Sequence, residues 1–530
     1  MLQRIKDKVR LKTVISVIPT ILFLVFLYYM MIKTYTGTVK STVEGTEVSL
    51  KGFTTLSDSF EEVLQDNIYE KNSYLDLNGL TVKVLGINSL NERQKLANGY
   101  LSTFEGIRDV STSIENTVEL NEFLTERGID FLYVLAPSVA SMYDAEFAPG
   151  YSSESWQNID TMIEALSEAG VNTIDMDSWF EENGWSTEDV FFVTDHHWKP
   201  EAAFAATNES LLFMEENFGI EYDDSMANYD IWTIDNYASS YLGSHGKRVG
   251  TNYAGVDDVQ VIYREDQSEV ELSYLTKGTT NWTYRNSVFD MAKLEKVDYY
   301  NLSPYHSYIG GDYPIVNIKN ENALNDLKII VVGDSFRLPV ETFLSSYFSE
   351  LYHIDLRHYT DGTFAQYVEE IQPDIVLMCT YEADLSTKSI YEFGTAAYIS
   401  CIEEQSEVLD VVDIGDISIE QSMDNNNNFT VVYSNLEPGQ TYTLTVDTTS
   451  ISGGADSYVQ MTLQDLSTNK AVYNRYFEAD SDETQKWIFT VPEDSSDTYS
   501  IYLYAGTKGH TKEVSVEVTD IKLRKGIYEE

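Results

Sequence analysis

The stretch LKIIVVGDSFRLPVETF, residues 327–343, decides the fold. The apolar run 327–332 is typical of a buried strand, Gly333 allows a tight turn, and Pro339 suits the first turn of a following helix. The apolar residues of that helix would share one face: Val340, Phe343, Leu344 and Tyr347. A buried strand that leads directly into a helix is the unit from which α/β folds are built.

The same alternation continues on both sides of this stretch. Strand-like runs are GIDFLYVLAP (128–137), GVNTIDM (170–176), ELYHIDLRH (350–358) and PDIVLMC (373–379). Helix-like runs are SWQNIDTMIEALSEAG (155–170), LPVETFLSSYF (338–348) and TFAQYVEEIQ (363–372). Continuous apolar strands between amphipathic helices require a parallel sheet covered on both faces. We therefore expect an α/β, flavodoxin-like domain with a parallel sheet over residues 76–402.

Two further segments differ in composition. Residues 220–325 are rich in Tyr and Asn and form an insertion, in which we expect extra β-structure and a substrate-binding surface. Residues 403–428, which end in NNNN, form a polar linker. Residues 429–530 contain about seven short alternating strands without helices, a pattern that predicts a β-sandwich or jelly roll.

The N-terminus predicts a membrane anchor. Residues 1–12 carry five basic residues against one acid, and 14–32 contain no charge, which is long enough for a helix to cross a bilayer. Because positive charge stays on the cytoplasmic side, we expect a cytoplasmic tail (1–12), a transmembrane helix (13–33), a stalk (34–75) and an extracellular catalytic part of a single-pass cell-membrane protein.

The charge balance excludes one class of partner. The 86 acidic and 35 basic residues give a formal net charge of −51, which repels the phosphate backbone of nucleic acids. The two cysteines, Cys379 and Cys401, are too few for a zinc ribbon. They could form a disulfide outside the cell, although a free buried thiol suits Cys379 at the end of an apolar run better.

Ser335 is the candidate nucleophile. It would stand at the carboxyl end of a parallel strand and at the start of a helix, where open α/β sheets place ligands and where free N–H groups can stabilise an oxyanion. The alternative is that Asp334 and Ser335 only cap the helix. A catalytic serine needs a partner base.

The stretch TDHHWKP, 194–200, offers such a base. Asp195 and His197 project to the same side of an extended segment, and Pro200 favours extended backbone before it and a helix after it. A carboxylate that fixes the tautomer of an imidazole is the arrangement that activates serine. The alternatives are a capping Asp beside a packed His, or metal binding by His196 and His197. We expect His196 to support the base and Trp198 to pack beneath it.

Together the motifs resemble the SGNH-like O-acetyltransferases of extracellular polysaccharides, such as the alginate-acetylating enzymes, and the DHHW family of bacterial surface proteins. The likeness spans about 75–402 and includes DLNGLTVKVLG, LANGYLS, TDHHWKPEAA, YLGSHGKRVG, YIGGDYPIVNIKN, VVGDSF and HIDLRHY. It implies an SGNH-like fold and a triad of Ser335 as nucleophile, His197 as base and Asp195 as orienting carboxylate, without cofactor or metal. It also implies a polysaccharide acceptor, a multi-spanning membrane acyltransferase as acetyl donor, and a carbohydrate-binding β-domain.

Some roles remain open. The usual Gly and Asn blocks of the oxyanion hole are missing, so the Ser335 N–H and a glycine from Gly310-Gly311 are the candidate donors. Lys247 and Arg248 could bind an anionic glycan or a donor phosphate, or be a solvated surface pair. An acetylesterase with the same triad, and a non-catalytic glycan-binding protein, are the alternative functions.

In the last domain, alternation favours Trp487 and Phe489 as core residues over a sugar platform. Its strand tyrosines are further candidates for stacking on sugar: Tyr473, Tyr476, Tyr499, Tyr502 and Tyr504.

Overall fold

The computed structural model describes residues 69–395 except 105, 150, 224–226, 269, 275–277, 283 and 360–361. It also describes 24–26, 28–34 and, beyond 395, chiefly the strands between 407 and 526. The chain forms two compact units, one of residues 1–91 with 247–255 and the other of 92–246 with 256–530.

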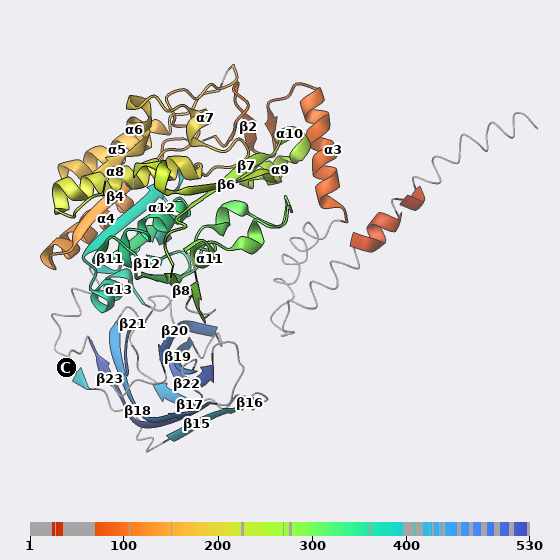
Figure 1. The fold of residues 1–530 in the computed structure, drawn as a ribbon. Helices are drawn as coiled ribbons and strands as arrows, with labels where there is room; N and C mark the ends of the chain where they lie inside the picture. Colours follow the sequence, from red (N-terminus) through yellow and green to blue (C-terminus); the bar gives the residue numbers. More distant parts are fainter. Residues whose placement is uncertain are drawn as a thin grey trace, which may run out of the picture. The chain divides into compact units, whose positions relative to one another are not determined.

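The centre of the larger unit is an eight-stranded sheet in the order β5-β4-β13-β11-β12-β10-β8-β9. Its first five strands are mutually parallel. Their bounds are β4 (Asp130–Ala136), β5 (Thr173–Asp175), β11 (Asn325–Gly333), β12 (Phe348–Ile354) and β13 (Ile375–Tyr381). These strands coincide with the apolar runs of the sequence, so the predicted α/β fold is confirmed (Figure 1).

The expectation of a purely parallel sheet is wrong at one edge. Three antiparallel strands follow β12, namely β10 (Ile315–Asn320), β8 (Val270–Tyr274) and β9 (Gly278–Trp282). They come from the 220–325 segment, where β8 and β9 are close in sequence and antiparallel pairing needs only a short connection. The sheet is therefore mixed.

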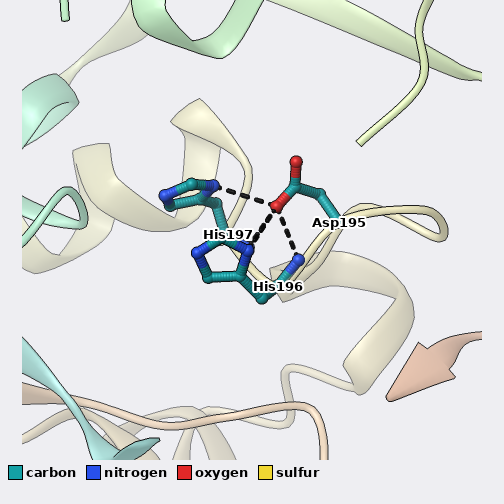
Figure 2. A group of neighbouring side chains, drawn as sticks. All are labelled: Asp195, His196 and His197. Carbon is teal, nitrogen blue, oxygen red and sulfur yellow. Dashed lines mark hydrogen bonds and ion pairs between the residues drawn. The ribbon is translucent and has the colours of Figure 1, made fainter. Parts of the chain in front are cut away.

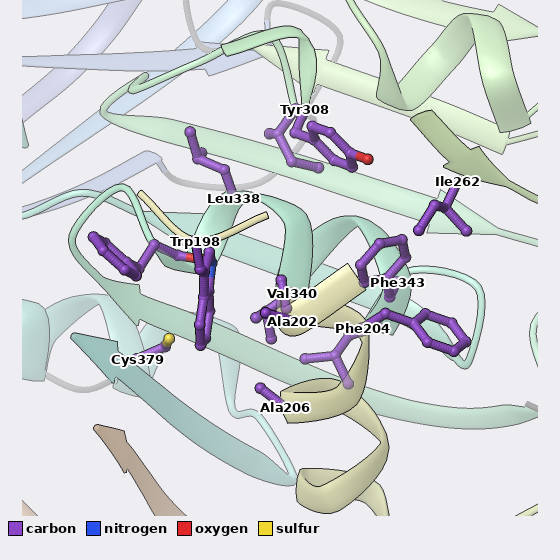
Figure 3. Packing of buried hydrophobic residues seen from close by; sticks show 14 of the residues in the cluster. Trp198, Ala202, Phe204, Ala206, Ile262, Tyr308, Leu338, Val340, Phe343 and Cys379 are labelled. Carbon is purple, nitrogen blue, oxygen red and sulfur yellow. The ribbon is translucent and has the colours of Figure 1, made fainter. Parts of the chain in front are cut away.

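Successive side chains of a strand point to opposite faces of the sheet, so these apolar strands have an apolar surface on both faces. Helices cover both of these faces. One core packs β4, β11 and β13 against α4 (Ser111–Glu126), α5 (Trp156–Glu168) and α13 (Phe364–Ile371). The other packs the alternate residues of the same strands against α8 (Pro200–Phe218) and α12 (Arg337–Leu344). Figure 3 shows this second core around Trp198, Phe204 and Phe343.

Helix α12 differs from its expected form. Val340, Phe343 and Leu344 are buried as predicted, but so is every other residue of the helix, including Arg337 and Glu341. The expected helix extended to Tyr347, whereas α12 ends at Leu344 and Tyr347 is buried beyond it. Because buried charges are costly unless they are paired, Arg337 and Glu341 need charged or hydrogen-bonding partners inside the protein.

The other described elements of this part of the chain are short. They include β1 (Ser89–Leu90), β2 (Arg93–Lys95), β3 (Leu101–Ser102), α6 (Met176–Glu182), α7 (Thr187–Val190), β6 (Thr233–Tyr241), α9 (Ser244–Val249), β7 (Asp257–Tyr263) and α11 (Tyr284–Val288). Five 3₁₀ turns add η2 (Tyr229–Ile231), η3 (Met291–Lys293), η4 (Pro304–Ser307), η5 (Glu382–Asp384) and η6 (Lys388–Ile390). The insertion thus carries the extra β-structure that we expected.

The C-terminal part contains all seven predicted strands in two antiparallel sheets (Figure 1). One has the order β16-β15-β23-β18-β21, with β14 on β23, and the other β17-β22-β19-β20. The bounds are β14 (Glu407–Val408), β15 (Ile417–Ser422), β16 (Asn425–Asn426), β17 (Phe429–Tyr433), β18 (Thr441–Ser452), β19 (Ser457–Asp465), β20 (Lys470–Glu478), β21 (Gln485–Thr490), β22 (Tyr499–Thr507) and β23 (Val514–Lys525). Trp487 and Phe489 are buried, which confirms the core prediction.

The smaller unit contains α3 (Lys71–Val84) and α10 (Thr251–Ala254). They pack closely at Gly79, where an added Cβ would lie 3.0 Å from the Cβ of Tyr253 in α10. Helix α3 begins inside the segment expected as a stalk. Among the described residues no helix is long and apolar enough to cross a membrane, and most of the predicted transmembrane segment (13–33) lies outside them.

Candidate active site

Ser335 stands on a sharp turn between β11 and α12. Gly333 ends the strand with φ 145°, and an added Cβ there would lie 1.8 Å from the Cys379 carbonyl oxygen on the neighbouring strand β13. Only glycine fits this position, because both the backbone angle and the close approach exclude a side chain. The turn therefore places Ser335 at the carboxyl edge of the sheet, where the residue is buried, with 7% of its surface exposed.

Asp334 fixes the turn from within. Its carboxylate accepts the N–H of Phe336 at 2.9 Å and that of Tyr381, at the end of β13, at 2.7 Å. Burial first, and then the Asp384 carboxylate, raise the pKa of Asp334 to about 7. Neither Asp334 nor Ser335 is the N-cap of α12, which is Phe336 and has no side-chain cap, so Asp334 fixes the turn while the Ser335 hydroxyl has another partner.

The segment 193–197 is held by hydrogen bonds to the insertion. The Asp257 carboxylate accepts the N–H groups of Val193 and Thr194, both at 2.9 Å, and the Thr194 hydroxyl at 2.5 Å. The Gly243 N–H donates to Thr194 Oγ1 at 2.8 Å, and the Gly246 N–H to the Thr194 carbonyl at 2.8 Å. This backbone is non-helical, as Pro200 at the first position of α8 predicted.

Asp195, His197 and Ser335 lie in one continuous chain of contacts. His197 Nδ1 is 3.0 Å from Asp195 Oδ1, and His197 Nε2 is 2.7 Å from Ser335 Oγ. With Nδ1 donating to the carboxylate, Nε2 is left as the acceptor for the serine hydroxyl. The structure thus brings together three side chains that are separated by up to 140 positions in sequence.

The Asp195 carboxylate has several donors. Its Oδ2 accepts the Ser244 N–H at 3.0 Å and the hydroxyl of Tyr241, and its Oδ1 accepts the His196 N–H at 2.6 Å. Burial acts to raise its pKa, but His197 and His196 outweigh burial and hold the pKa of this carboxyl well below its usual range. Asp195 is therefore charged and immobile.

The pKa of His197 is lowered to about 4, first by burial and then by His196, while Asp195 opposes the shift. At neutral pH this imidazole is neutral and can accept a proton. The ring stacks on Tyr305 with centroids 4.0 Å apart, and the Tyr305 hydroxyl donates to the Ser335 carbonyl at 3.1 Å. Tyr305 therefore fixes the distance between base and nucleophile.

His196 shares the same carboxylate oxygen (Figure 2). Its Nδ1 lies 2.8 Å from Asp195 Oδ1 and 2.7 Å from Ser244 Oγ, and its ring centroid is 3.8 Å from that of His197. Burial acts to lower its pKa, but Asp195 outweighs burial and raises it. These contacts agree with the supporting role that we expected.

The metal-binding alternative rests on the same three side chains. One ligand atom each from Asp195, His196 and His197 lies within 4.8 Å of the others. Both Nδ1 atoms, however, already point to one carboxylate oxygen, and His197 Nε2 points away to Ser335. The donor set is arranged for proton transfer, since a metal would have to displace both imidazole–carboxylate contacts.

Trp198 connects the two motifs. It is fully buried, and its Nε1 donates to the Phe336 carbonyl at 3.0 Å, directly after the nucleophile. The Phe336 ring in turn stacks on that of Tyr381, with centroids 4.4 Å apart. The prediction that Trp198 packs beneath the motif is confirmed.

The candidate oxyanion glycines are not free in this conformation. The Gly310 N–H donates to the Ser307 carbonyl and the Gly311 N–H to the Tyr308 carbonyl, both at 3.1 Å. Because these amides already have acceptors within a backbone turn, the structure argues against an oxyanion role for them.

Lys247 and Arg248 lie in the last turn of α9 and belong to the smaller unit. Arg248 is exposed and Lys247 is half-buried. Their contact with a glycan or a phosphate stays a prediction.

Sequence reasoning missed Tyr241, Ser244, Asp257 and Tyr305. All four lie in the 220–325 insertion. Tyr241 and Ser244 donate to Asp195, Tyr305 donates to the Ser335 carbonyl, and Asp257 holds the backbone of Thr194 next to Asp195. A Tyr-rich insertion was visible in the sequence, but which tyrosine faces the site depends on long-range packing.

A comparison with protein families finds a match to part of the chain. Residues 101–217 match the model described as "SGNH hydrolase-like domain, acetyltransferase AlgX". The match includes Asp195 and His197 and ends before Ser335. The predicted resemblance to SGNH-like acetyltransferases is thus confirmed for this segment. No curated protein matches the chain.

Several solved structures are similar to the chain. PatB1 from Bacillus cereus with a sulfonyl adduct has 19% identity and a TM-score of 0.49, over 57% of this chain and 98% of PatB1. A DHHW family protein from Eubacterium siraeum has 18% identity and a TM-score of 0.43, over 57% and 95%. AlgX from Pseudomonas aeruginosa has 14% identity and a TM-score of 0.38, over 81% and 94%.

Proposed function

We propose that this chain is a membrane-anchored O-acetyltransferase that acetylates a hydroxyl group of an extracellular polysaccharide through an acyl-serine. The observation that carries the proposal is the continuous contact from Asp195 through His197 to Ser335 at the carboxyl edge of the sheet. The family match, which includes Asp195 and His197, supports acetyl transfer as the reaction.

In the first half-reaction Ser335 Oγ attacks the carbonyl carbon of the acyl donor, and its proton passes to His197 Nε2. The C–O bond to the donor then breaks, and His197 returns the proton to the leaving oxygen. Asp195 keeps the imidazole in the required tautomer and stabilises its transient positive charge. The product is an ester on Ser335.

In the second half-reaction a sugar hydroxyl gives its proton to His197 Nε2 and attacks the acyl carbon. The bond from Ser335 Oγ to this carbon breaks, and the oxygen regains the proton. Both tetrahedral intermediates carry a negative oxygen that needs an N–H donor. The Ser335 N–H has no acceptor among the described residues and is our assigned donor.

The membrane parts of the proposal rest on the sequence. The uncharged run 14–32 after a basic tail supports an anchor that leaves the catalytic part outside the cell. An acetyl donor must then reach that side, which calls for a multi-spanning membrane acyltransferase as a partner. The β-domain after residue 428 would bind the polysaccharide.

The test uses the full-length chain in detergent with p-nitrophenyl acetate and oligosaccharide acceptors. We expect acetylated sugar, a burst of p-nitrophenol and an acetyl adduct on the peptide that contains Ser335, all absent in Ser335→Ala. Ser386→Ala, at an exposed serine after β13, is the matched control and should keep full turnover. Free acetate without acetylated sugar would identify an esterase, and equal turnover in Ser335→Ala would refute the triad.

A further inference from the structure

Two exposed aromatic rings contact each other near the start of α5. Phe104 and Tyr151 form a pair with ring centroids 5.0 Å apart, and each is 49% exposed. Tyr143 and Trp156 are exposed to a similar degree in the same loop and at the first position of α5. Large apolar rings grouped on a surface usually mark a binding site.

These rings lie at the same edge of the sheet as Ser335. Strands β4, β13 and β11 are parallel neighbours, so their carboxyl ends share one edge. The loop 137–155, which carries Tyr143 and Tyr151, follows β4 at that edge, and Ser335 follows β11 there. Ligands of open α/β sheets bind at this edge.

Buried hydrogen bonds connect the loop of Phe104 to the nucleophile turn. Asn158, which is 1% exposed, donates to the Gly106 carbonyl at 2.9 Å and to Glu382 Oε1 at 2.7 Å, and it accepts the Arg108 N–H at 2.9 Å. Glu382 directly follows Tyr381, which is tied to the nucleophile turn. These bonds connect the backbone at Gly106 and Arg108, close in sequence to Phe104, to the end of β13 beside the nucleophile turn.

We propose that Phe104 and Tyr151 form a platform for the polysaccharide acceptor, and that this acceptor is a neutral or amino-sugar polymer. The proposal rests on the function proposed above and names its substrate class. The C–H face of a sugar ring packs on an aromatic face, and paired rings lose little conformational freedom when they bind. Ser152, Ser153 and Gly106 beside the rings suit a polar polymer better than an apolar protein surface.

The charges near the platform determine the sugar class. The two loops, 101–109 and 137–155, contain five acidic residues and one basic residue, Arg108. Glu146, Glu154 and Asp109 are exposed. A uronic acid polymer would meet like charges here, whereas a neutral polymer would not and an amino-sugar polymer would be attracted.

The test measures binding without catalysis, in the full-length chain with Ser335→Ala. The probes are hexasaccharides of N-acetylglucosamine, glucosamine, glucose and guluronate, titrated by calorimetry. Adding Phe104→Ala or Tyr151→Ala should weaken binding of the N-acetylglucosamine or glucose probe roughly 3- to 10-fold. Tyr151→Phe, which keeps the ring, should bind normally. Leu324→Ala removes an exposed apolar residue before β11, at the opposite edge, and should also have no effect.

Guluronate should bind at least about tenfold more weakly than the uncharged probes at low salt, and high salt should narrow this gap. Unchanged binding in both ring variants, no binding of any probe, or equal binding of guluronate would overturn the proposal. A dimer that the ring variants abolish would reassign the surface to protein contact and also overturn it. Turnover of p-nitrophenyl acetate is measured in parallel in the full-length chain that keeps Ser335. No turnover in that chain, with ring-dependent binding intact in the Ser335→Ala chain, would refute the catalytic function alone.

Discussion

Two buried histidines, His197 and His353, each hold a carboxylate at Nδ1 but have different partners at Nε2. His197 Nδ1 lies 3.0 Å from Asp195, and His353 Nδ1 lies 2.7 Å from Glu341. The other nitrogen of His197 faces the hydroxyl of Ser335, whereas that of His353 lies 2.7 Å from the Tyr313 carbonyl oxygen. A carboxylate–imidazole pair thus becomes a candidate catalytic site only where its far nitrogen meets a nucleophile.

The surroundings of His353 explain its separate role. Arg337 lies 2.8 Å from Glu341 and 3.3 Å from Asp355, and all three are fully buried. Arg337 Nη1 also donates to the Gly333 carbonyl at 2.9 Å and to that of Asp334 at 2.5 Å, beneath the nucleophile turn. This ionic cluster holds the turn in place, and among the described residues none of its side chains makes a hydrogen bond to the Ser335 hydroxyl, which faces His197.

His197→Ala gives the largest expected effect. Loss of the base should reduce turnover of p-nitrophenyl acetate about 10⁴-fold, because the serine hydroxyl then lacks a proton acceptor. The folded state should persist, with a similar melting temperature. Steady-state kinetics and circular dichroism measure the two quantities. If turnover falls less than about tenfold, His197 is not the base.

His353→Leu should act on stability instead. Removing the imidazole leaves the buried Glu341 carboxylate without one hydrogen-bond partner and should cost about 1–3 kcal/mol of unfolding free energy, measured by urea denaturation. Turnover per folded molecule should change far less than in His197→Ala. His358→Leu, at an exposed histidine five residues later, is the control and should stay within about 0.5 kcal/mol of wild type. A stable but inactive His353→Leu would contradict the assignment of His353 to stability and His197 to catalysis.

The sequence predicted the parts of the site that local pattern encodes. The strand–Gly–Asp–Ser–helix order placed Ser335, and the extended TDHHW segment placed Asp195 and His197 on one side. It did not reveal that α12 is buried on all sides or that Arg337 has buried partners. The 3.6-residue periodicity identifies the most apolar face of a helix but does not show whether its other faces are also buried. It also missed Tyr305 and Tyr241, since their contacts span 30 and 46 positions.

Gly243→Ala tests how closely the triad is packed. An added Cβ would lie 2.3 Å from the Cβ and 2.6 Å from the Cα of Asp195, so that residue must move. We expect about 100-fold slower turnover, because small displacements of a catalytic group are costly, and a loss of about 1–3 kcal/mol in stability. Gly106→Ala, which meets nothing within 4 Å, should leave turnover of the small ester unchanged. Equal effects of the two variants would contradict the close packing.

His196→Gln should give the smallest change, in the pH profile. His196 contributes to the lowered pKa of His197, so its removal should raise that pKa from about 4. Because only the neutral imidazole accepts a proton, the acid limb of kcat/KM should move to higher pH, by up to about one unit, or about 1.4 kcal/mol. The plateau rate should fall only a few-fold, since His197 keeps its own contact with Asp195. An unmoved limb would mean that the two imidazoles on one carboxylate oxygen are not electrostatically coupled, and a shift to lower pH would mean that His196 supports the charged form of His197.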